Sequence, residues 1–382
     1  MQKPAKKLGF GFMRMPCTDK NDQKAIDLPQ VEQMVDKFLS RGFTYCDTAW
    51  MYHDFVSEDT VGKAVVDRYP REAFTIATKM PDMMLKSKDE VAEIFAKQKA
   101  KLHVDYFDYY LVHDMNSANY EKAKKFDVLP FVRAKRKSGE IRCLGFSCHD
   151  SAEVLDRILQ ENPYFEFVQL QINYLDWESA GIQAHKCYDV CVKHGVPVIV
   201  MEPVKGGTLA NPPENVKKLL HDAHPDWSPA EWAIRFAASL DNVMVVLSGM
   251  STLAQLDENT RFMQDFEPLS PADWSLLLKA AEMIRQSIAI PCTGCRYCVE
   301  ASKCPKNILI PNYFALFNTR KLMHRRDYSP EIEYYENYIG QGYGKASDCI
   351  ACRACERVCP QHIPIADWMQ KVAPDLEGGQ QL

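Results

Sequence analysis

Short apolar segments alternate with longer amphipathic segments along the first 270 residues of the chain. Apolar runs of about four to eight residues between turn residues are typical of buried strands, whereas apolar positions three and four apart predict helices with one buried face. The predicted strands are 8–13, 44–47, 74–78, 107–112, 142–146, 167–171, 197–201 and 244–247. The clearest predicted helices are 29–40, 57–68, 88–102, 152–160, 180–193 and 229–238.

Eight such repeats over about 260 residues match the size and the strand–helix order of a TIM barrel. We therefore expect an α/β fold, a (β/α)8 barrel, over residues 1–270. The alternative is a doubly wound open sheet, which commonly carries a GxGxxG fingerprint after its first strand. Only Gly9 and Gly11 of that pattern are present, so the barrel is favoured.

The composition is that of an ordinary globular protein of 382 residues, 46% hydrophobic and 25% charged, with a formal net charge of −5. This length predicts one large domain and a smaller one. A mildly negative chain gives no reason to expect nucleic acid or an anionic membrane as a partner. The sequence shows neither a signal peptide nor a membrane-spanning apolar run, so we expect a cytoplasmic protein.

Polar side chains stand at the ends of three successive predicted strands. Asp47 ends the second strand with Tyr52 shortly after it, Lys79 follows the third, and His113 follows the fourth. Each residue alone has an ordinary explanation: a helix cap, a packed tyrosine, a solvated strand end or a core imidazole. In a parallel barrel, however, these strand ends meet at one mouth, and the four together indicate an active site.

Their chemistry suits the reduction of a carbonyl group. The developing alkoxide needs a proton donor, and a free tyrosine has a pKa of about 10, too high for efficient acid–base chemistry near neutrality. A neighbouring ammonium group lowers that pKa, and a buried lysine needs a carboxylate partner. We therefore assign Tyr52 as the acid, Lys79 as the group that lowers its pKa, Asp47 as the partner of Lys79, and His113 as the group that orients the substrate oxygen.

The motifs DTAxxY, ATK and LVH, which contain these four residues, resemble those of the aldo-keto reductase family. The resemblance covers residues 8–265. It implies a TIM barrel with an Asp–Tyr–Lys–His tetrad and hydride transfer from a nicotinamide cofactor, usually NADPH, to an aldehyde or ketone.

The same resemblance implies a set of cofactor contacts. Ser147 and Gln169 match residues that hold the nicotinamide carboxamide, whereas Cys148 stands where the family has asparagine. Met201 takes the place of an aromatic residue that covers the nicotinamide ring. The segment that would hold the adenosine end contains Ser248, Gly249, Gln255 and Asn259. The next basic residue is Arg261, so the choice between NADPH and NADH stays open.

The last part of the chain differs in kind. We expect a connecting helix over 271–289, built on the helical pattern of 271–287, and a small α-rich domain over 290–382 with helices at 312–326 and 331–338 that pack on the barrel. Eight of the fourteen cysteines fall here, in two runs. These runs are Cys292-x2-Cys295-x2-Cys298-x5-Cys304 and Cys349-x2-Cys352-x2-Cys355-x3-Cys359.

The second run has the spacing of bacterial ferredoxins, and the first departs only in its last gap. Residues 290–365 resemble two-cluster ferredoxins, which implies that the last cysteine of each run serves the cluster of the other. One 4Fe–4S cluster would then use Cys292, Cys295, Cys298 and Cys359, and the other would use Cys349, Cys352, Cys355 and Cys304. Paired CxxC motifs can also form zinc sites, which need only two pairs of cysteines and leave the third of each run unexplained.

These observations lead to three hypotheses. We favour an NAD(P)H-dependent reductase acting on a small-molecule carbonyl substrate, with two 4Fe–4S clusters in its tail. The alternative is an electron-transfer protein that couples a hydride step to a ferredoxin-like redox partner. The third hypothesis is a binding or sensor module whose barrel has lost catalysis. It is motivated by Cys148 and Met201, where the chain departs from the residues of the family.

Overall fold

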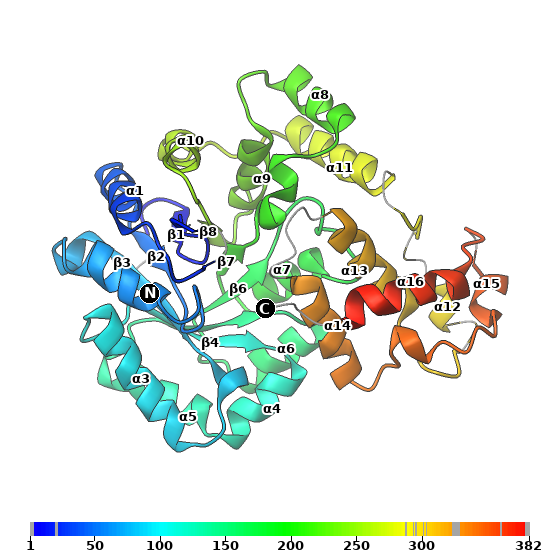
Figure 1. Cartoon of the computed structure of the whole chain (residues 1–382), viewed down its shortest axis with the longest axis horizontal. Coiled ribbons are helices and arrows are strands. Elements are labelled where there is room, and N and C mark those ends of the chain that lie inside the picture. The colour runs from blue at the N-terminus through cyan, green and yellow to red at the C-terminus, as the bar shows by residue number, and fades with distance from the viewer. Residues whose placement is uncertain are drawn as a thin grey trace.

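The computed structural model describes residues 4–19, 22–286, 289–292, 294, 296–300, 302, 304–322, 329–359 and 361–378. Eight parallel strands pair in sequence order and close into a barrel (Figure 1). They are β1 (Leu8–Gly11), β2 (Tyr45–Asp47), β3 (Thr75–Met80), β4 (Tyr109–Met115), β5 (Leu144–Cys148), β6 (Phe167–Gln171), β7 (Val198–Met201) and β8 (Val243–Ser248). The predicted TIM barrel is confirmed.

Helices surround the barrel. They are α1 (Leu28–Ser40), α2 (Ser57–Val61), α3 (Asp89–Leu102), α4 (Ser117–Lys125), α5 (Val128–Ser138), α6 (Ala152–Glu161), α7 (Ala184–Lys193), α8 (Glu214–Ala223), α9 (Pro229–Ala238) and α10 (Leu253–Gln264). Helix α1 begins where the Asp27 carboxylate accepts a hydrogen bond from the backbone N–H of Gln30 at 3.2 Å, as expected of an N-cap. Its helical periodicity buries one face, made of Val31, Met34, Val35 and Phe38.

Three departures from the predicted bounds have a local structural cause. The helix predicted over 57–68 is divided into α2 and a π-helical turn, Gly62–Val66. At Gly62 the backbone comes close to the end of α3, where a β-carbon on Gly62 would lie 2.5 Å from the Lys101 carbonyl oxygen. Helix α7 starts four residues later than predicted, because Gln183 has a left-handed φ of 56°. Strand β4 runs past residue 112 through a register shift between Val112 and Met115. Local periodicity carries no signal for a bulge or a left-handed residue.

The barrel interior is filled by side chains. Its buried cluster consists of Tyr45, Ala77, Tyr109, Leu111, Cys143, Phe167, Ile199, Met244, Val245 and Leu247. Because this part of the interior is packed, chemistry is confined to the end where the strands finish, as in other barrels of this kind.

Helix α11 (Pro271–Gln286) lies over the residues predicted as a connecting helix, of which 287 and 288 are outside the described residues. It packs against α8 and α9, and the Trp274 ring stacks on Phe236 with centroids 4.4 Å apart. The helix therefore contributes to the outer layer of the barrel. Among the described residues, no helix combines the length and the apolar character needed to cross a bilayer.

The C-terminal segment forms a group of helices on one side of the barrel (Figure 1). They are α12 (Tyr297–Glu300), α13 (Ile310–Leu322), α14 (Pro330–Gly340), α15 (Ala354–Arg357) and α16 (Ile365–Glu377). The predicted helices 312–326 and 331–338 correspond to α13 and α14, with 323–326 outside the described residues.

Helices α13 and α14 dock on loops that follow β5 and β6. The Tyr338 hydroxyl donates to the Gly181 carbonyl at 2.7 Å, and the Asn337 amide donates to the His149 carbonyl at 2.9 Å. The Gln341 amide donates to the Asp150 carboxylate at 2.8 Å. The C-terminal segment therefore reaches the barrel at the end where an active site is expected.

Candidate functional site

A buried ion pair lies at the mouth of the barrel. The Lys79 ammonium from β3 donates to the Asp47 carboxylate from β2 at 2.6 Å, and to the Thr48 carbonyl at 2.8 Å. The side chains of Lys79 and Asp47 are 0% and 3% exposed. The second Asp47 oxygen accepts a longer hydrogen bond from the Gln169 amide at 3.4 Å. Two charges this deeply buried are held as a pair, as the sequence led us to expect.

Tyr52 and His113 lie beside this ion pair. The Lys79 ammonium is 5.0 Å from the centroid of the Tyr52 ring. The rings of Tyr52 and His113 meet edge to face with centroids 6.1 Å apart. The four side chains predicted to form the active site are therefore brought together by the ends of β2, β3 and β4 and the loop after β2.

The surroundings of Lys79 and His113 shift their pKa values in opposite directions. Burial alone would lower the Lys79 pKa, but the Asp47 carboxylate and the Tyr52 phenol together raise the pKa above its ordinary value, so Lys79 is an ammonium. Burial, followed by the charges of Lys79 and His149, holds the pKa of His113 well below its ordinary value. His113 is therefore a neutral imidazole near neutral pH, and its Nδ1 atom is buried without a hydrogen-bond partner among the described residues.

The Tyr52 phenol differs from the sequence expectation. Burial raises its pKa above the ordinary value, while the Lys79 ammonium acts in the opposite direction and offsets only part of the rise. Tyr52 is therefore a protonated phenol in this structure. The predicted lowering by Lys79 is real as one contribution, but the loss of water around the ring outweighs it.

The residues expected to hold the nicotinamide end lie around the same mouth. Gln169 is buried in β6, and Ser147 is buried in β5, where its hydroxyl accepts from the backbone N–H of Asp114 at 2.8 Å. Met201 is half-buried at the end of β7. Cys148, in contrast, belongs to the apolar core shared with the surrounding helices.

The residues expected to hold the adenosine end occupy the end of β8 and the start of α10. The Asn259 amide donates to the Ser248 hydroxyl at 3.0 Å. Gln255 is exposed and accepts from the backbone N–H of Ser251 at 2.8 Å, and Gly249 is also exposed.

Two arginines, Arg261 and Arg14, are candidates for a positive charge near this segment. The Arg261 guanidinium lies 3.6 Å from the Glu231 carboxylate. Arg14, from the loop after β1, lies against the segment: a β-carbon on Gly249 would be 3.4 Å from the Arg14 β-carbon. The Arg14 carbonyl also accepts from the Ser251 hydroxyl at 2.8 Å. Sequence reasoning overlooked Arg14, although it follows the first strand directly.

A second buried charge network joins the barrel to the C-terminal helices. The Lys205 ammonium donates to both Asp176 oxygens at 2.7 Å and lies 3.4 Å from the Glu331 carboxylate of α14. The side chains of Asp176 and Glu331 are 0% exposed. No local pattern in the sequence could show this network, because Lys205 and Glu331 are 126 residues apart.

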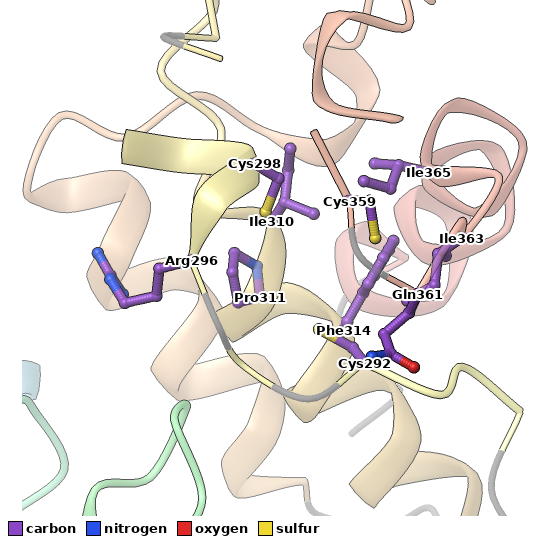
Figure 2. Close-up of a pocket in the computed structure, with 10 residues that line it drawn as sticks. All are labelled: Cys292, Arg296, Cys298, Ile310, Pro311, Phe314, Cys359, Gln361, Ile363 and Ile365. Atoms are coloured by element: carbon purple, nitrogen blue, oxygen red, sulfur yellow. The ribbon is translucent and has the colours of Figure 1, made fainter. Parts of the chain in front are cut away.

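The C-terminal segment contains two cysteine-lined cavities. Cys292, Cys298 and Cys359 line the first, a space of about 320 Å³ that is partly open to solvent and is otherwise lined largely by apolar side chains. Figure 2 shows Cys298 and Cys359 directing their sulfur atoms into this space from two sides. Cys295 lies outside the described residues.

The second cavity is similar in size, about 350 Å³, and its cysteines are Cys304, Cys349, Cys352 and Cys355. Ile310 and Ile365 line both cavities, which are therefore neighbours. Each cavity combines cysteines of one run with the last cysteine of the other run. A soft, thiolate-rich donor set in an apolar space suits an iron–sulfur cluster.

Comparison with known proteins agrees with both parts of the chain. Residues 7–282 match the model of the aldo/keto reductase family, and residues 291–363 match a 4Fe-4S dicluster domain. An uncharacterized oxidoreductase, YqkF, from Bacillus subtilis (strain 168) is 23% identical over 284 residues, which cover 66% of this chain and 85% of that protein. An L-galactose dehydrogenase from Arabidopsis thaliana is 23% identical over 256 residues, covering 60% and 76%.

Solved structures share the barrel fold. The holo form of aldo-keto reductase AKR11C1 from Bacillus halodurans superposes with a TM-score of 0.57 at 23% identity, covering 73% of this chain and 95% of that one. An aldo-keto reductase from Klebsiella pneumoniae in complex with NADPH gives a TM-score of 0.55 at 19% identity, with coverages of 73% and 95%. The chain is an oxidoreductase that belongs to the aldo/keto reductase family and continues into a 4Fe-4S dicluster domain.

Proposed function

We propose that this protein interconverts a small-molecule aldehyde or ketone and its alcohol with NADP(H) or NAD(H), using Asp47, Tyr52, Lys79 and His113. The observation that carries the proposal is the buried Lys79–Asp47 pair at 2.6 Å beside a protonated tyrosine and a neutral histidine. A relative of known structure was solved with NADPH, which supports this class of cofactor.

Each side chain has a defined part in this reaction. When bound, the nicotinamide supplies a hydride to the carbonyl carbon. Tyr52 donates its hydroxyl proton to the carbonyl oxygen as negative charge develops there, and the resulting phenolate is stabilised by the Lys79 ammonium. Asp47 keeps Lys79 charged in a buried position. His113, being neutral, has one N–H with which to orient the same oxygen.

Three residues of the mouth are proposed for the nicotinamide end of the cofactor. Gln169 and Ser147 would bind the nicotinamide carboxamide, and Met201 would cover one face of the ring. At the other end, Ser248, Gly249, Gln255 and Asn259 would bind the adenosine portion. We add Arg14 to this set, because the carbons of its side chain lie against Gly249 and its guanidinium, 3.9 Å from the Glu202 carboxylate, supplies a positive charge at the same mouth.

A pair of substitutions tests the tyrosine assignment. Tyr52→Phe removes only the proton donor, and we expect it to lower kcat for NADPH-dependent reduction of a panel of aldehydes and ketones by about 10²- to 10⁴-fold. Tyr45→Phe is the matched control, because the Tyr45 hydroxyl is buried in the barrel interior without a hydrogen-bond partner among the described residues. Equal activity of wild type and Tyr52→Phe would refute the assignment.

We further propose that the two cavities bind 4Fe–4S clusters through the cysteines that line them, with Cys295 completing the first set. When bound, such clusters supply one-electron redox capacity. A tetrathiolate zinc site typically takes its four ligands from two CxxC pairs, whereas each proposed set combines three cysteines of one run with the last cysteine of the other. Iron, sulfide and zinc analysis after anaerobic purification separates the two metals: iron with equimolar sulfide supports clusters, and zinc alone contradicts them.

Electron transfer to a redox protein is the second candidate function. It is favoured by the position of the second cavity, where Cys352 is exposed and Ile350 is 58% exposed, since an electron carrier needs a cluster near the surface. The hydride carries two electrons, so both clusters, one electron each, would have to be reduced together. Anaerobic addition of NADPH should bleach the cluster absorbance if this coupling exists, and an unchanged spectrum would leave the clusters without that role.

A further inference from the structure

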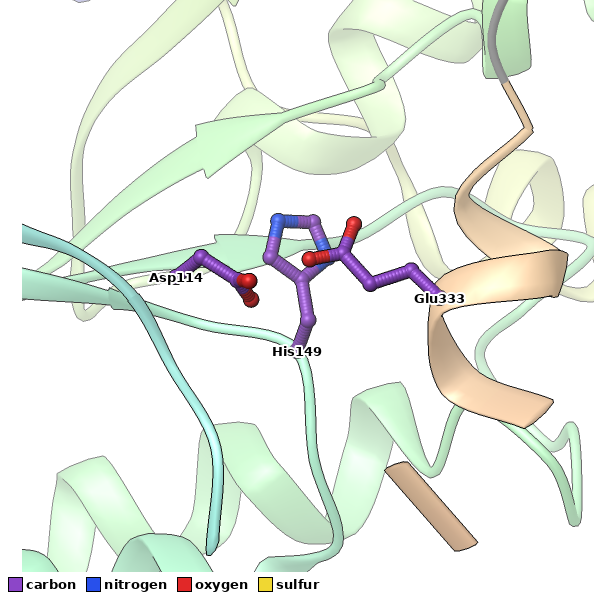
Figure 3. A group of neighbouring side chains, drawn as sticks. All are labelled: Asp114, His149 and Glu333. Carbon is purple, nitrogen blue, oxygen red and sulfur yellow. The ribbon is translucent and has the colours of Figure 1, made fainter. Parts of the chain in front are cut away.

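Three metal-binding side chains meet where α14 reaches the barrel. They are Asp114 from β4, His149 from the loop after β5, and Glu333 from α14. One ligand atom from each lies within 4.8 Å of the other two. Figure 3 shows the carboxylates of Asp114 and Glu333 approaching the His149 ring from opposite sides. These residues belong to neither the predicted tetrad nor the cysteine cavities.

The histidine of this group has a ring nitrogen without a hydrogen-bond partner in the described ranges. His149 is 7% exposed, and its Nδ1 atom is buried without a hydrogen-bond partner among the described residues. Asp82, whose charge acts on Asp114, is 0% exposed, and neither of its oxygens has a partner in the part of the chain that the structure describes. Carboxylates this close together repel one another unless a proton or a cation lies between them.

The backbone directs Asp114 into this cluster. It lies in the bulge of β4 with a left-handed φ of 53°, a conformation that residues other than glycine rarely adopt. The Asn119 amide donates to one Asp114 oxygen at 2.9 Å and fixes the carboxylate. The backbone N–H of Asp114 bonds to Ser147 at 2.8 Å, which ties β4 to β5 at this level.

We propose that Asp114, His149 and Glu333 bind one divalent metal ion of the transition series. A mixed nitrogen and carboxylate donor set suits Zn²⁺ and Mn²⁺, whose ligands stand about 2.0–2.2 Å from the ion. Ligand atoms within 4.8 Å of one another can reach that distance by small side-chain rotations. The ion joins the ends of β4 and β5 to α14, and therefore fastens the dicluster domain to the barrel mouth. This site does not depend on the proposed reaction.

Mn²⁺ is the most suitable probe, because it prefers oxygen and nitrogen ligands and leaves the cysteine sites undisturbed. The experiment titrates Mn²⁺ into anaerobically purified, oxidised holoprotein that was first treated with a chelator, and follows free Mn²⁺ by its EPR signal. We expect one Mn²⁺ to bind per chain, and Zn²⁺ to displace it. Retained iron content shows that the protein under test still holds its clusters.

Two variants of α14 give a matched comparison. Glu333→Gln removes one proposed ligand and should weaken Mn²⁺ binding at least about tenfold. Glu336→Gln makes the same charge change one turn further along the helix, at an exposed residue outside the cluster, and should bind as wild type does. If Glu333→Gln does not fold, Asp114→Asn replaces it, with the same expected loss. Unchanged free Mn²⁺ with wild type, or equal affinity in all variants, would overturn the proposal and assign the carboxyl pair a shared proton.

Discussion

Removing only the carboxylate of the Lys79–Asp47 pair should destabilise the protein more than removing both charges. Asp47→Asn leaves the Lys79 ammonium 0% exposed and without its carboxylate partner, while the Thr48 carbonyl still accepts from it at 2.8 Å. An uncompensated buried charge costs about 3–5 kcal/mol of stability. Lys79→Met should cost less. Burial already raises the Asp47 pKa despite the neighbouring ammonium, so without Lys79 this carboxyl group takes up a proton and becomes neutral.

The double variant Asp47→Asn/Lys79→Met contains neither charge and should be close in stability to Lys79→Met alone. The coupling free energy between the two sites then equals the cost of Asp47→Asn alone, about 3–5 kcal/mol. Urea unfolding of the anaerobic holoprotein measures this coupling free energy. Far-UV circular dichroism follows the barrel and cluster absorbance follows the C-terminal segment, because the two domains need not unfold together. All three variants should lose carbonyl reduction. A double variant destabilised by the full sum of the single variants would refute the interaction.

Three further predictions concern other parts of the molecule. Burial raises the pKa of Glu58 to about 7 in the folded protein, compared with 4.5 in the unfolded chain. The protonated carboxyl group therefore stabilises the fold fully below pH 4.5, and this stabilisation is lost as the pH rises through about 7. In wild type, the free energy of unfolding measured in urea should fall by at most about 3 kcal/mol between pH 5 and 8 because of Glu58, and Glu58→Gln should not show this fall. The same pH dependence in Glu58→Gln and wild type would contradict the prediction. Cys359→Ser should reduce the iron content from two clusters to one, whereas Cys187→Ser, in the core of α7, should retain both; full iron in Cys359→Ser would exclude this cysteine as a ligand. Glu331→Gln removes the α14 carboxylate from Lys205 and should speed amide hydrogen exchange in α14 while the barrel strands stay protected, and equal exchange rates would show that the contact does not hold the helix.

The sequence predicted the barrel and the content of its mouth because both depend on local patterns. Strand and helix periodicity repeats eight times, and in a parallel barrel every strand end faces the same side. Asp47, Tyr52, Lys79 and His113 therefore had to approach one another, as they do in the structure. Their roles in catalysis stay predictions.

What escaped prediction depends on long-range contacts and on burial. The bulge that places Asp114, and the arrival of Glu331 and Glu333 on α14, come from packing between residues far apart in the chain. The Tyr52 pKa depends on how much water the folded mouth excludes, which residue identity alone does not state. The position of Arg14 beside Gly249 escaped prediction for the same reason, since only the fold brings the loop after β1 to the end of β8.

The most direct test of the proposed reaction follows the hydride itself. The protein is incubated with NADPH deuterated at the transferable position and a reducible aldehyde or ketone, and the alcohol is analysed by mass spectrometry. The proposal predicts one deuterium on the carbinol carbon with wild type, and almost none with Tyr52→Phe in the same time. Alcohol formed without deuterium, or no alcohol from any carbonyl tested while both clusters are present, would contradict it.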